Sequence, residues 1–146
     1  MPRYSDPSFG DTKQLTYPGK AGTTLVWTPK AGTSAGTKTT TEDGESIGFW
    51  KAVKIKQIVY TVKTVQTGTG DNINFILYVD GTAYGTLAVT TEVGSSVCTS
   101  SVINATCAAG KVVKIREHSI RTASDDSPAI GFLSLTYQEL FDNVDR

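Results

Sequence analysis

The stretch NINFILYVDGTAYGTLAVT, residues 72–90, does most to decide the fold of this chain. Its first half has an apolar residue at every second position, which is the period of a strand with one buried face. The alternating residues are Ile73, Phe75, Leu77 and Val79. Asp80-Gly81 follows, a dipeptide that favours a two-residue hairpin turn. The stretch therefore predicts a β-hairpin whose return strand points Leu87 and Val89 into the core.

Short strands with the same spacing are predicted on both sides of this hairpin. They cover residues 47–50, 53–65, 101–107, 111–120 and 130–139. Within 53–65 the alternation slips by one residue near Lys56-Gln57, which predicts a β-bulge. Residues 93–100 are expected as a loop, and only 137–144 has a composition that allows a helical turn. About six or seven strands roughly ten residues apart predict an all-β jelly roll or β-sandwich.

Residues 1–46 differ in composition from the rest. Four prolines and six glycines interrupt them, and their one apolar island is Leu25-Val26-Trp27. We expect an extended N-terminal arm over residues 1–46 and a β-sandwich domain over residues 47–146. Because the arm cannot bury a core of its own, either the body of its own subunit or a neighbouring subunit must hold it.

Length and charge narrow the classes of function. A chain of 146 residues has room for one domain. Lys and Arg number 14 and Asp and Glu also number 14, so no basic excess points to nucleic acid or to a membrane surface. The first residues lack the apolar core of a secretory signal, and no apolar run is long enough to span a bilayer. We expect a soluble protein made in a cytosol.

Catalytic and metal-binding signatures are not found. The chain has one histidine, His118, and no G-x-S-x-G motif that would expose a nucleophile. Cys98, Cys107 and His118 lack the spacing of a zinc site. We therefore predict no catalytic residues, no cofactor and no metal. The two cysteines are expected as free thiols in a reducing cytosol, with a single bridge between them as the alternative.

Three tyrosines keep a second class of function open. If Tyr60, Tyr78 and Tyr84 share one face of a sheet, they could stack on sugar rings. Packing within the sandwich is the simpler interpretation of the same residues. A carbohydrate- or receptor-binding module is thus the alternative to an assembly protein.

Three runs together resemble a known class of jelly rolls. They are Asn74-Phe75-Ile76-Leu77-Tyr78-Val79-Asp80-Gly81-Thr82, Ala109-Gly110-Lys111-Val112-Val113-Lys114-Ile115 and Gly131-Phe132-Leu133-Ser134-Leu135-Thr136-Tyr137-Gln138-Glu139. Their layout is similar to that of the capsid decoration (cement) proteins of tailed phages and to related head-fibre and receptor-binding domains. The likeness covers about residues 47–140.

This resemblance implies a structural virion protein that is not an enzyme. Its expected partners are the major capsid protein and further copies of itself in a homotrimer. The expected location is the capsid surface, after synthesis in the host cytoplasm. Arm residues Leu25, Val26 and Trp27, with Tyr4 and Tyr17, are the candidate partner contacts. In this hypothesis Trp27 anchors an arm strand on a neighbour, and the alternative is that Trp27 packs against its own body.

Overall fold

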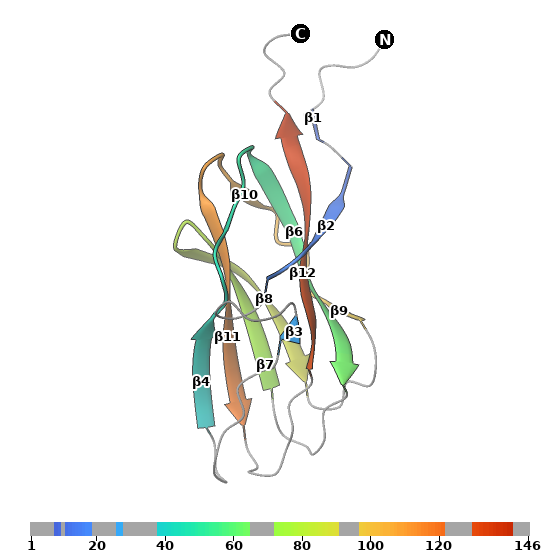
Figure 1. Cartoon of the computed structure of the whole chain (residues 1–146), viewed down its shortest axis with the longest axis vertical. Coiled ribbons are helices and arrows are strands. Elements are labelled where there is room, and N and C mark those ends of the chain that lie inside the picture. Colours follow the sequence, from blue (N-terminus) through green and yellow to red (C-terminus); the bar gives the residue numbers. More distant parts are fainter. Residues whose placement is uncertain are drawn as a thin grey trace.

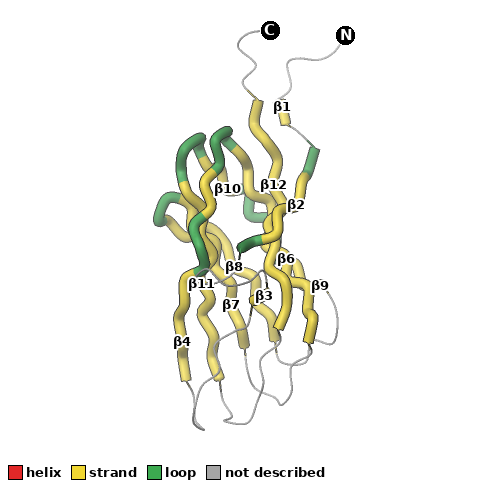
Figure 2. Tube along the Cα trace, viewed as in Figure 1, coloured by secondary structure: helices red, strands yellow, loops and turns green. Residues whose placement is uncertain are grey.

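The computed structural model describes residues 8–9, 11–18, 26–27, 38–64, 72–90, 97–121 and 130–141, and every element in these ranges is a strand (Figures 1 and 2). The strands are β1 (Ser8–Phe9), β2 (Lys13–Thr16), β3 (Val26–Trp27), β4 (Lys38–Asp43), β5 (Ile47–Gly48), β6 (Val53–Thr64), β7 (Asn72–Val79), β8 (Thr82–Thr90), β9 (Val97–Thr99), β10 (Ala105–Cys107), β11 (Val112–Arg121) and β12 (Ile130–Phe141). Among the described residues, no helix is long and apolar enough to cross a membrane.

The strands form two antiparallel sheets. In the first sheet β12 and β6 are central partners. The short strands β1, β2 and β3 follow one another along the free edge of β12, while β9 and β10 share the free edge of β6. In the second sheet β11 and β7 are central, β4 and β5 share the outer edge of β11, and β8 pairs with β7.

This topology is that of a jelly roll. When strands that share an edge are counted as one row, the described strands make eight rows in sequence order: β1–β3, β4–β5, β6, β7, β8, β9–β10, β11 and β12. The first sheet then has row order 1-8-3-6 and the second has row order 2-7-4-5. Successive rows alternate between the sheets except at the β7–β8 hairpin, and eight rows arranged in this way form the two-sheet jelly roll. The predicted fold class is confirmed.

The hairpin and the bulge both occur where the sequence predicts them. Asp80 and Gly81 have φ angles of 48° and 82°, so both turn residues are left-handed, as a type I′ turn requires. On the opposite sheet, Thr136 pairs with Gln57 and Tyr137 pairs with Ile55. Lys56 is therefore the extra residue of a β-bulge.

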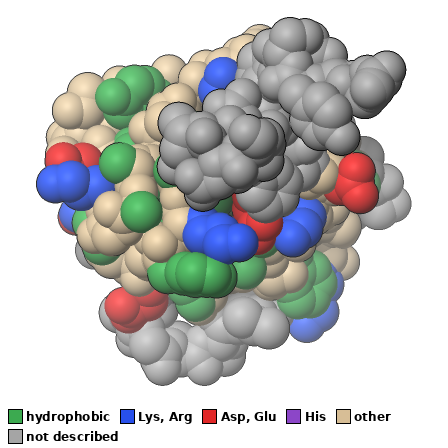
Figure 3. All heavy atoms as spheres, turned by 90° about the horizontal axis from the view of Figure 1, so that it is seen from above, with side chains coloured by type: hydrophobic (Ala, Val, Ile, Leu, Met, Phe, Trp, Pro, Cys, Tyr) green, Lys and Arg blue, Asp and Glu red, His purple; other side chains and the backbone are tan. Residues whose placement is uncertain are grey.

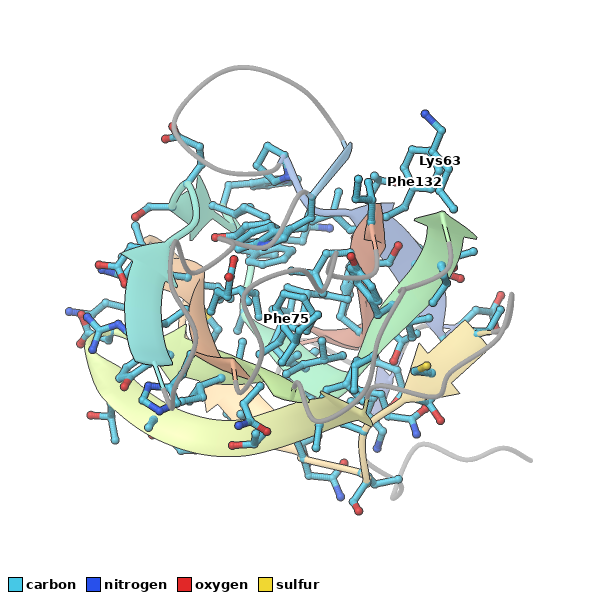
Figure 4. The ribbon with its side chains drawn as sticks, turned by 90° about the horizontal axis from the view of Figure 1, so that it is seen from below. Lys63, Phe75 and Phe132 are labelled. Carbon is cyan, nitrogen blue, oxygen red and sulfur yellow. The ribbon has the colours of Figure 1, made fainter. Side chains whose placement is uncertain are left out.

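The core lies between the two sheets. Figure 4 looks along the sandwich and shows Phe75 inside it, whereas Lys63 and Phe132 point away from the centre. The Phe75 ring lies 5.5 Å from the Trp27 ring and 4.8 Å from the Tyr60 ring, measured between centroids. These side chains come from both sheets, so the aromatic contacts hold the two layers together.

The described segments of the arm are parts of the same two sheets. β2 and β3 pair with β12, and β4 pairs with β11. Tyr17 and Trp27 are fully buried in the common core. Of the two ways to hold the arm, these segments use the body of their own subunit. The division of the chain at Ser46 stays a prediction about domain organisation.

Three segments differ from expectation because pairing in the sheets overrides local composition. The expected loop at 93–100 contains β9, which pairs with β6 at Val59–Thr61. The expected strand at 101–107 is reduced to β10. Residues 137–141 continue β12 as a strand and do not form a helical turn, since Tyr137 to Glu139 pair with β6 and the next two residues pair with β1.

Candidate protein-binding surfaces

Of the five predicted partner contacts in the arm, two lie outside the described residues, one belongs to a strand, and two are buried in the core. Tyr4 and Leu25 lie outside the described residues, and Val26 belongs to β3. Trp27 is 0% exposed, and its Nε1 donates a hydrogen bond of 2.7 Å to Oε2 of Glu117. Of the two interpretations of Trp27, packing within its own body is the one that the structure shows.

Tyr17 is the second arm residue inside the core. Its hydroxyl oxygen accepts a hydrogen bond of 3.0 Å from the backbone N–H of Ile115 and donates one to the carbonyl of Glu45. Burial raises the pKa of Tyr17 to about 12, so the hydroxyl keeps its proton at neutral pH. A Cβ atom on Gly44 would lie 2.6 Å from the Tyr17 ring, so glycine is needed there for the ring to fit. Tyr17 thus joins the arm to β11 and to the β4–β5 connection.

Among the described residues, the most exposed large hydrophobic one is Trp50, between β5 and β6. Its side chain is 83% exposed, although tryptophan is usually well buried. The backbone on both sides is fixed: the Phe49 carbonyl accepts a hydrogen bond from the N–H of Gly110, and the Ala52 carbonyl accepts one from the N–H of Leu140. The Phe49 ring packs inward on Tyr137, 5.3 Å between centroids. Trp50 is therefore held outward on a well-anchored loop.

Two further features accompany Trp50 at this end of the sandwich, and Trp50, Lys51 and Val112 are called the Trp50 end below. The Lys51 ammonium lies 4.8 Å from the centre of the Trp50 ring, in a cation–π contact. Val112 is 45% exposed and lies opposite Gly48 in the β5–β11 ladder. Figure 3 looks onto this end and shows hydrophobic side chains next to Lys and Arg side chains.

The remaining exposed large hydrophobic residues of the described part lie on one side of the sandwich. They are Tyr84, Val97 and Val102, exposed by 51%, 60% and 59%. Tyr84 is the extra residue of a bulge in β8, because Leu77 pairs with Gly85 and Tyr78 pairs with Ala83. β8, β9 and the loop Ser100–Asn104 make up this side, which is called the β8–β9 side surface.

The β8–β9 side surface joins the edges of both sheets. A Cβ atom on Gly85 would lie 2.7 Å from the Ile103 side chain, so β8 and the loop approach closely there. The loop is tied to β6 by hydrogen bonds from the Ile103 N–H to the Lys56 carbonyl, 2.7 Å, and from the Ile58 N–H to the Ser100 hydroxyl, 3.0 Å. The bulge at Lys56 therefore helps to shape this side.

A charged network covers the outer face of the second sheet. Asp43 accepts hydrogen bonds from Nε of Arg116, 2.6 Å, and from Nζ of Lys114, 3.0 Å. The hydrogen bonds from Arg116 and Lys114 lower the pKa of Asp43 to about 2. The Arg116 guanidinium also lies 4.8 Å from the centre of the Tyr78 ring. His118 follows two residues later on the same face of β11, half-buried.

The three tyrosines considered for sugar stacking do not share a sheet face. Tyr60 is fully buried in β6 of the first sheet. Tyr78 and Tyr84 belong to β7 and β8 of the second sheet, and only Tyr84 is largely exposed. A stacking platform of all three tyrosines is therefore excluded.

The described residues offer little for catalysis. Within these ranges, no three His, Cys, Asp or Glu side chains gather as a metal-binding group. Cys98 and Cys107 are free, so the free-thiol prediction is confirmed. Burial raises the pKa of the Cys107 thiol, which disfavours the reactive thiolate.

Comparison with known proteins gives no family. No family model matches the sequence, and no curated protein is significantly similar to it. Similar solved structures include infectious bursal disease virus Gx strain, at 14% identity and TM-score 0.47 over 92% of this chain and 33% of that chain. The structure of the Gt strain is similar at 14% identity and TM-score 0.40, over 91% of this chain and 33% of that chain. The VP2 subviral particle of the same virus is similar at 15% identity and TM-score 0.43, over 89% of this chain and 32% of that chain. This chain spans about a third of the length of each.

Sequence reasoning missed Trp50, although a signal for it exists. Phe49 and Trp50 are adjacent, and adjacent residues of an extended segment point to opposite sides. If one of the two rings enters the core, the other must point to solvent. The structure buries much of Phe49 and exposes Trp50.

Proposed function

We propose that this chain is a structural, non-enzymatic protein of a viral particle. It binds the major capsid protein on the outer surface of the shell and associates with copies of itself as a trimer. The viral setting rests on the jelly-roll fold and on the sequence resemblance. The protein-binding role rests on the surface of this chain.

The observation that carries the binding role is the exposure of Trp50. A monomer gains nothing from holding an 83% exposed tryptophan outward on an anchored loop. Tryptophan is among the residues that dominate the energy of protein interfaces, because its large rigid ring buries much area at little entropic cost. Val112 widens the apolar area beside it.

In this proposal Tyr17 and Trp27 act within their own subunit, whereas Tyr4 and Leu25 stay candidate partner contacts. Because Trp27 and Tyr17 fill the core of their own subunit, they help to set the spacing of the two sheets. In this proposal the Trp50 end binds the capsid. Its loop is already anchored, so the Trp50 ring can enter the contact without a cost for ordering the loop. In a trimer, three such ends engage the shell together, so that weak single contacts give strong overall binding.

Co-sedimentation with shells assembled from the major capsid protein of the same virus tests this proposal. Wild-type protein should pellet with the shells. Trp50→Ala should bind about 30-fold more weakly or worse, since truncating an interface hot spot costs about 2 kcal/mol or more. Lys63→Ala is the control, because Lys63 is exposed near the opposite end of β6. Equal pelleting of Trp50→Ala and wild type would contradict the assignment, and no pelleting of wild type would contradict capsid docking.

A carbohydrate- or receptor-binding module is the second candidate function. What favours it is the ordered pair of Arg116 and Tyr78 on the outer sheet face, where a flat ring and a cation lie 4.8 Å apart. Such a pair suits an acidic sugar. A glycan array on wild type and Arg116→Gln separates the candidates: a signal lost in the variant supports this function, and a blank array argues against it.

A further inference from the structure

One long stretch of the chain is almost without charge. Residues 82–110 contain a single charged residue, Glu92, although Lys, Arg, Asp and Glu make up 19% of the chain. Solvated surfaces normally carry mixed charges, which keep a protein soluble and discourage association. Depletion of charge is typical of the central part of protein interfaces.

The structure places most of the described part of this stretch, residues 82–90 and 97–104, along one side of the sandwich. β8, β9 and the loop Ser100–Asn104 form the β8–β9 side surface, with Gly85 against Ile103. Three of the five exposed large hydrophobic residues in the described ranges lie on it, namely Tyr84, Val97 and Val102. The Lys56 ammonium, which donates a hydrogen bond of 2.5 Å to Oδ1 of Asn104, is a charged group at this surface. Several exposed apolar residues on an uncharged segment are typical of an interaction site.

β8 adds a sheet edge without charged residues to this surface. Among the described strands it pairs with β7 alone, so the backbone groups of its other edge face away from the sheet. Its nine residues, TAYGTLAVT, include no charged residue and no proline. β4, at the opposite edge of the same sheet, carries Lys38, Glu42 and Asp43. Natural proteins usually protect long edges with such charges or with bulges. β8 has its bulge at Tyr84, near its start, so the part after Tyr84 is the edge open to pairing.

We propose that the β8–β9 side surface is a contact between copies of this chain. Because β8 carries no charged residue, a second copy can pair along it without like-charge repulsion from that strand, and the chain as a whole has a net charge of +0. The inference deepens the self-association part of the proposed function and does not depend on capsid docking. An extended strand of the neighbouring copy lies along β8, and Tyr84, Val97 and Val102 pack against that copy.

In a closed trimer each copy uses the β8–β9 side surface for one neighbour and a different face for the other. The surface is separate from the Trp50 end, where Trp50 and Val112 account for the remaining exposed large hydrophobic residues of the described ranges. One molecule can therefore bind a shell and its own copies at the same time.

Two substitutions test the contact by adding charge to it. Val97→Lys and Val102→Lys change side chains that are 60% and 59% exposed, so the fold should tolerate them. Val112→Lys is the matched control, because it makes the same change at an exposed valine of the Trp50 end. Circular dichroism and thermal melting check that all three variants fold as wild type does.

The readout is mass in solution by multi-angle light scattering over a range of protein concentrations. Wild type and Val112→Lys should form oligomers of the 15.6 kDa chain. Val97→Lys and Val102→Lys should raise the dissociation constant at least about tenfold, because the contact would bury a charge that has no partner. A monomeric wild type at several hundred micromolar would overturn the inference. The same holds if Val97→Lys and Val102→Lys both fold and leave the mass unchanged. Shell co-sedimentation with Trp50→Ala tests capsid docking separately.

Discussion

Replacing Trp27 with alanine should destabilise the fold strongly, because this arm residue completes the core. Its ring lies 6.0 Å from Tyr17 and 5.5 Å from Phe75, and its Nε1 donates a 2.7 Å hydrogen bond to the buried Glu117 carboxylate. Emptying a buried tryptophan site costs about 3–5 kcal/mol. The lost hydrogen bond to a charged group adds about 1.5–3 kcal/mol, part of which relaxation offsets.

We therefore expect Trp27→Ala to lower the free energy of unfolding by about 4–6 kcal/mol. Trp27→Phe keeps an aromatic ring and removes only the donor and some volume, so its cost should be about 2–3 kcal/mol. Domains of this kind have a total stability of about 5–15 kcal/mol, so the alanine variant loses a large share of it and would unfold if the total lies near the low end.

Urea titration followed by circular dichroism measures these differences as shifts in midpoint at constant slope. The chain has two tryptophans, so Trp50→Ala is a matched control. Because Trp50 is 83% exposed, its removal should change the free energy of unfolding by no more than about 0.5 kcal/mol. A Trp27→Ala variant within about 1 kcal/mol of wild type would refute the conclusion that the arm is built into its own core.

Two further predictions concern the arm and the outer sheet face. Tyr17→Phe leaves the buried N–H of Ile115 without the hydroxyl oxygen that accepts its hydrogen bond, and should cost about 1–3 kcal/mol in the same urea titration; a neutral substitution would contradict this bridging role. Asp43 has a pKa of about 2 in the folded protein against a usual 3.8, so its contribution is present above about pH 4 and is lost as pH falls toward 2. Since Asp43 and Arg116 are partly exposed, that contribution should be below about 1 kcal/mol, and the Asp43→Asn variant should lose less stability than wild type between about pH 4 and pH 2. Identical pH profiles of the two proteins would show that the pair adds no stability.

The hairpin at Asp80-Gly81 and the bulge at Lys56 were predictable because both are local. A left-handed turn depends on the two residues that form it, and a slip in alternation is visible in the strand that carries it. The inward positions of β7 and the all-β class follow from the same two-residue period. These features depend only on residues that are neighbours in the sequence, so the sequence is sufficient to predict them.

Glu117 shows where local reasoning stops. Its place in the alternation of β11, with Val113 and Ile115, puts it on the inner face, but a carboxylate there is costly without a partner. One partner is Trp27, 90 residues earlier in the chain, and only the folded sandwich brings them within 2.7 Å. Neither residue alone predicts the pair.

By itself, the sequence determined the strand period, the hairpin, the bulge and the absence of a catalytic signature, because each depends on neighbouring residues. Only the tertiary structure decided that Tyr17 and Trp27 face inward while Trp50 faces outward. An apolar arm residue gains a similar free energy by burial in its own body or in a neighbour, so its composition cannot choose between them. That choice depends on which sheet edge lies within reach, and here the open edge of β12 accepts the arm strands of its own chain.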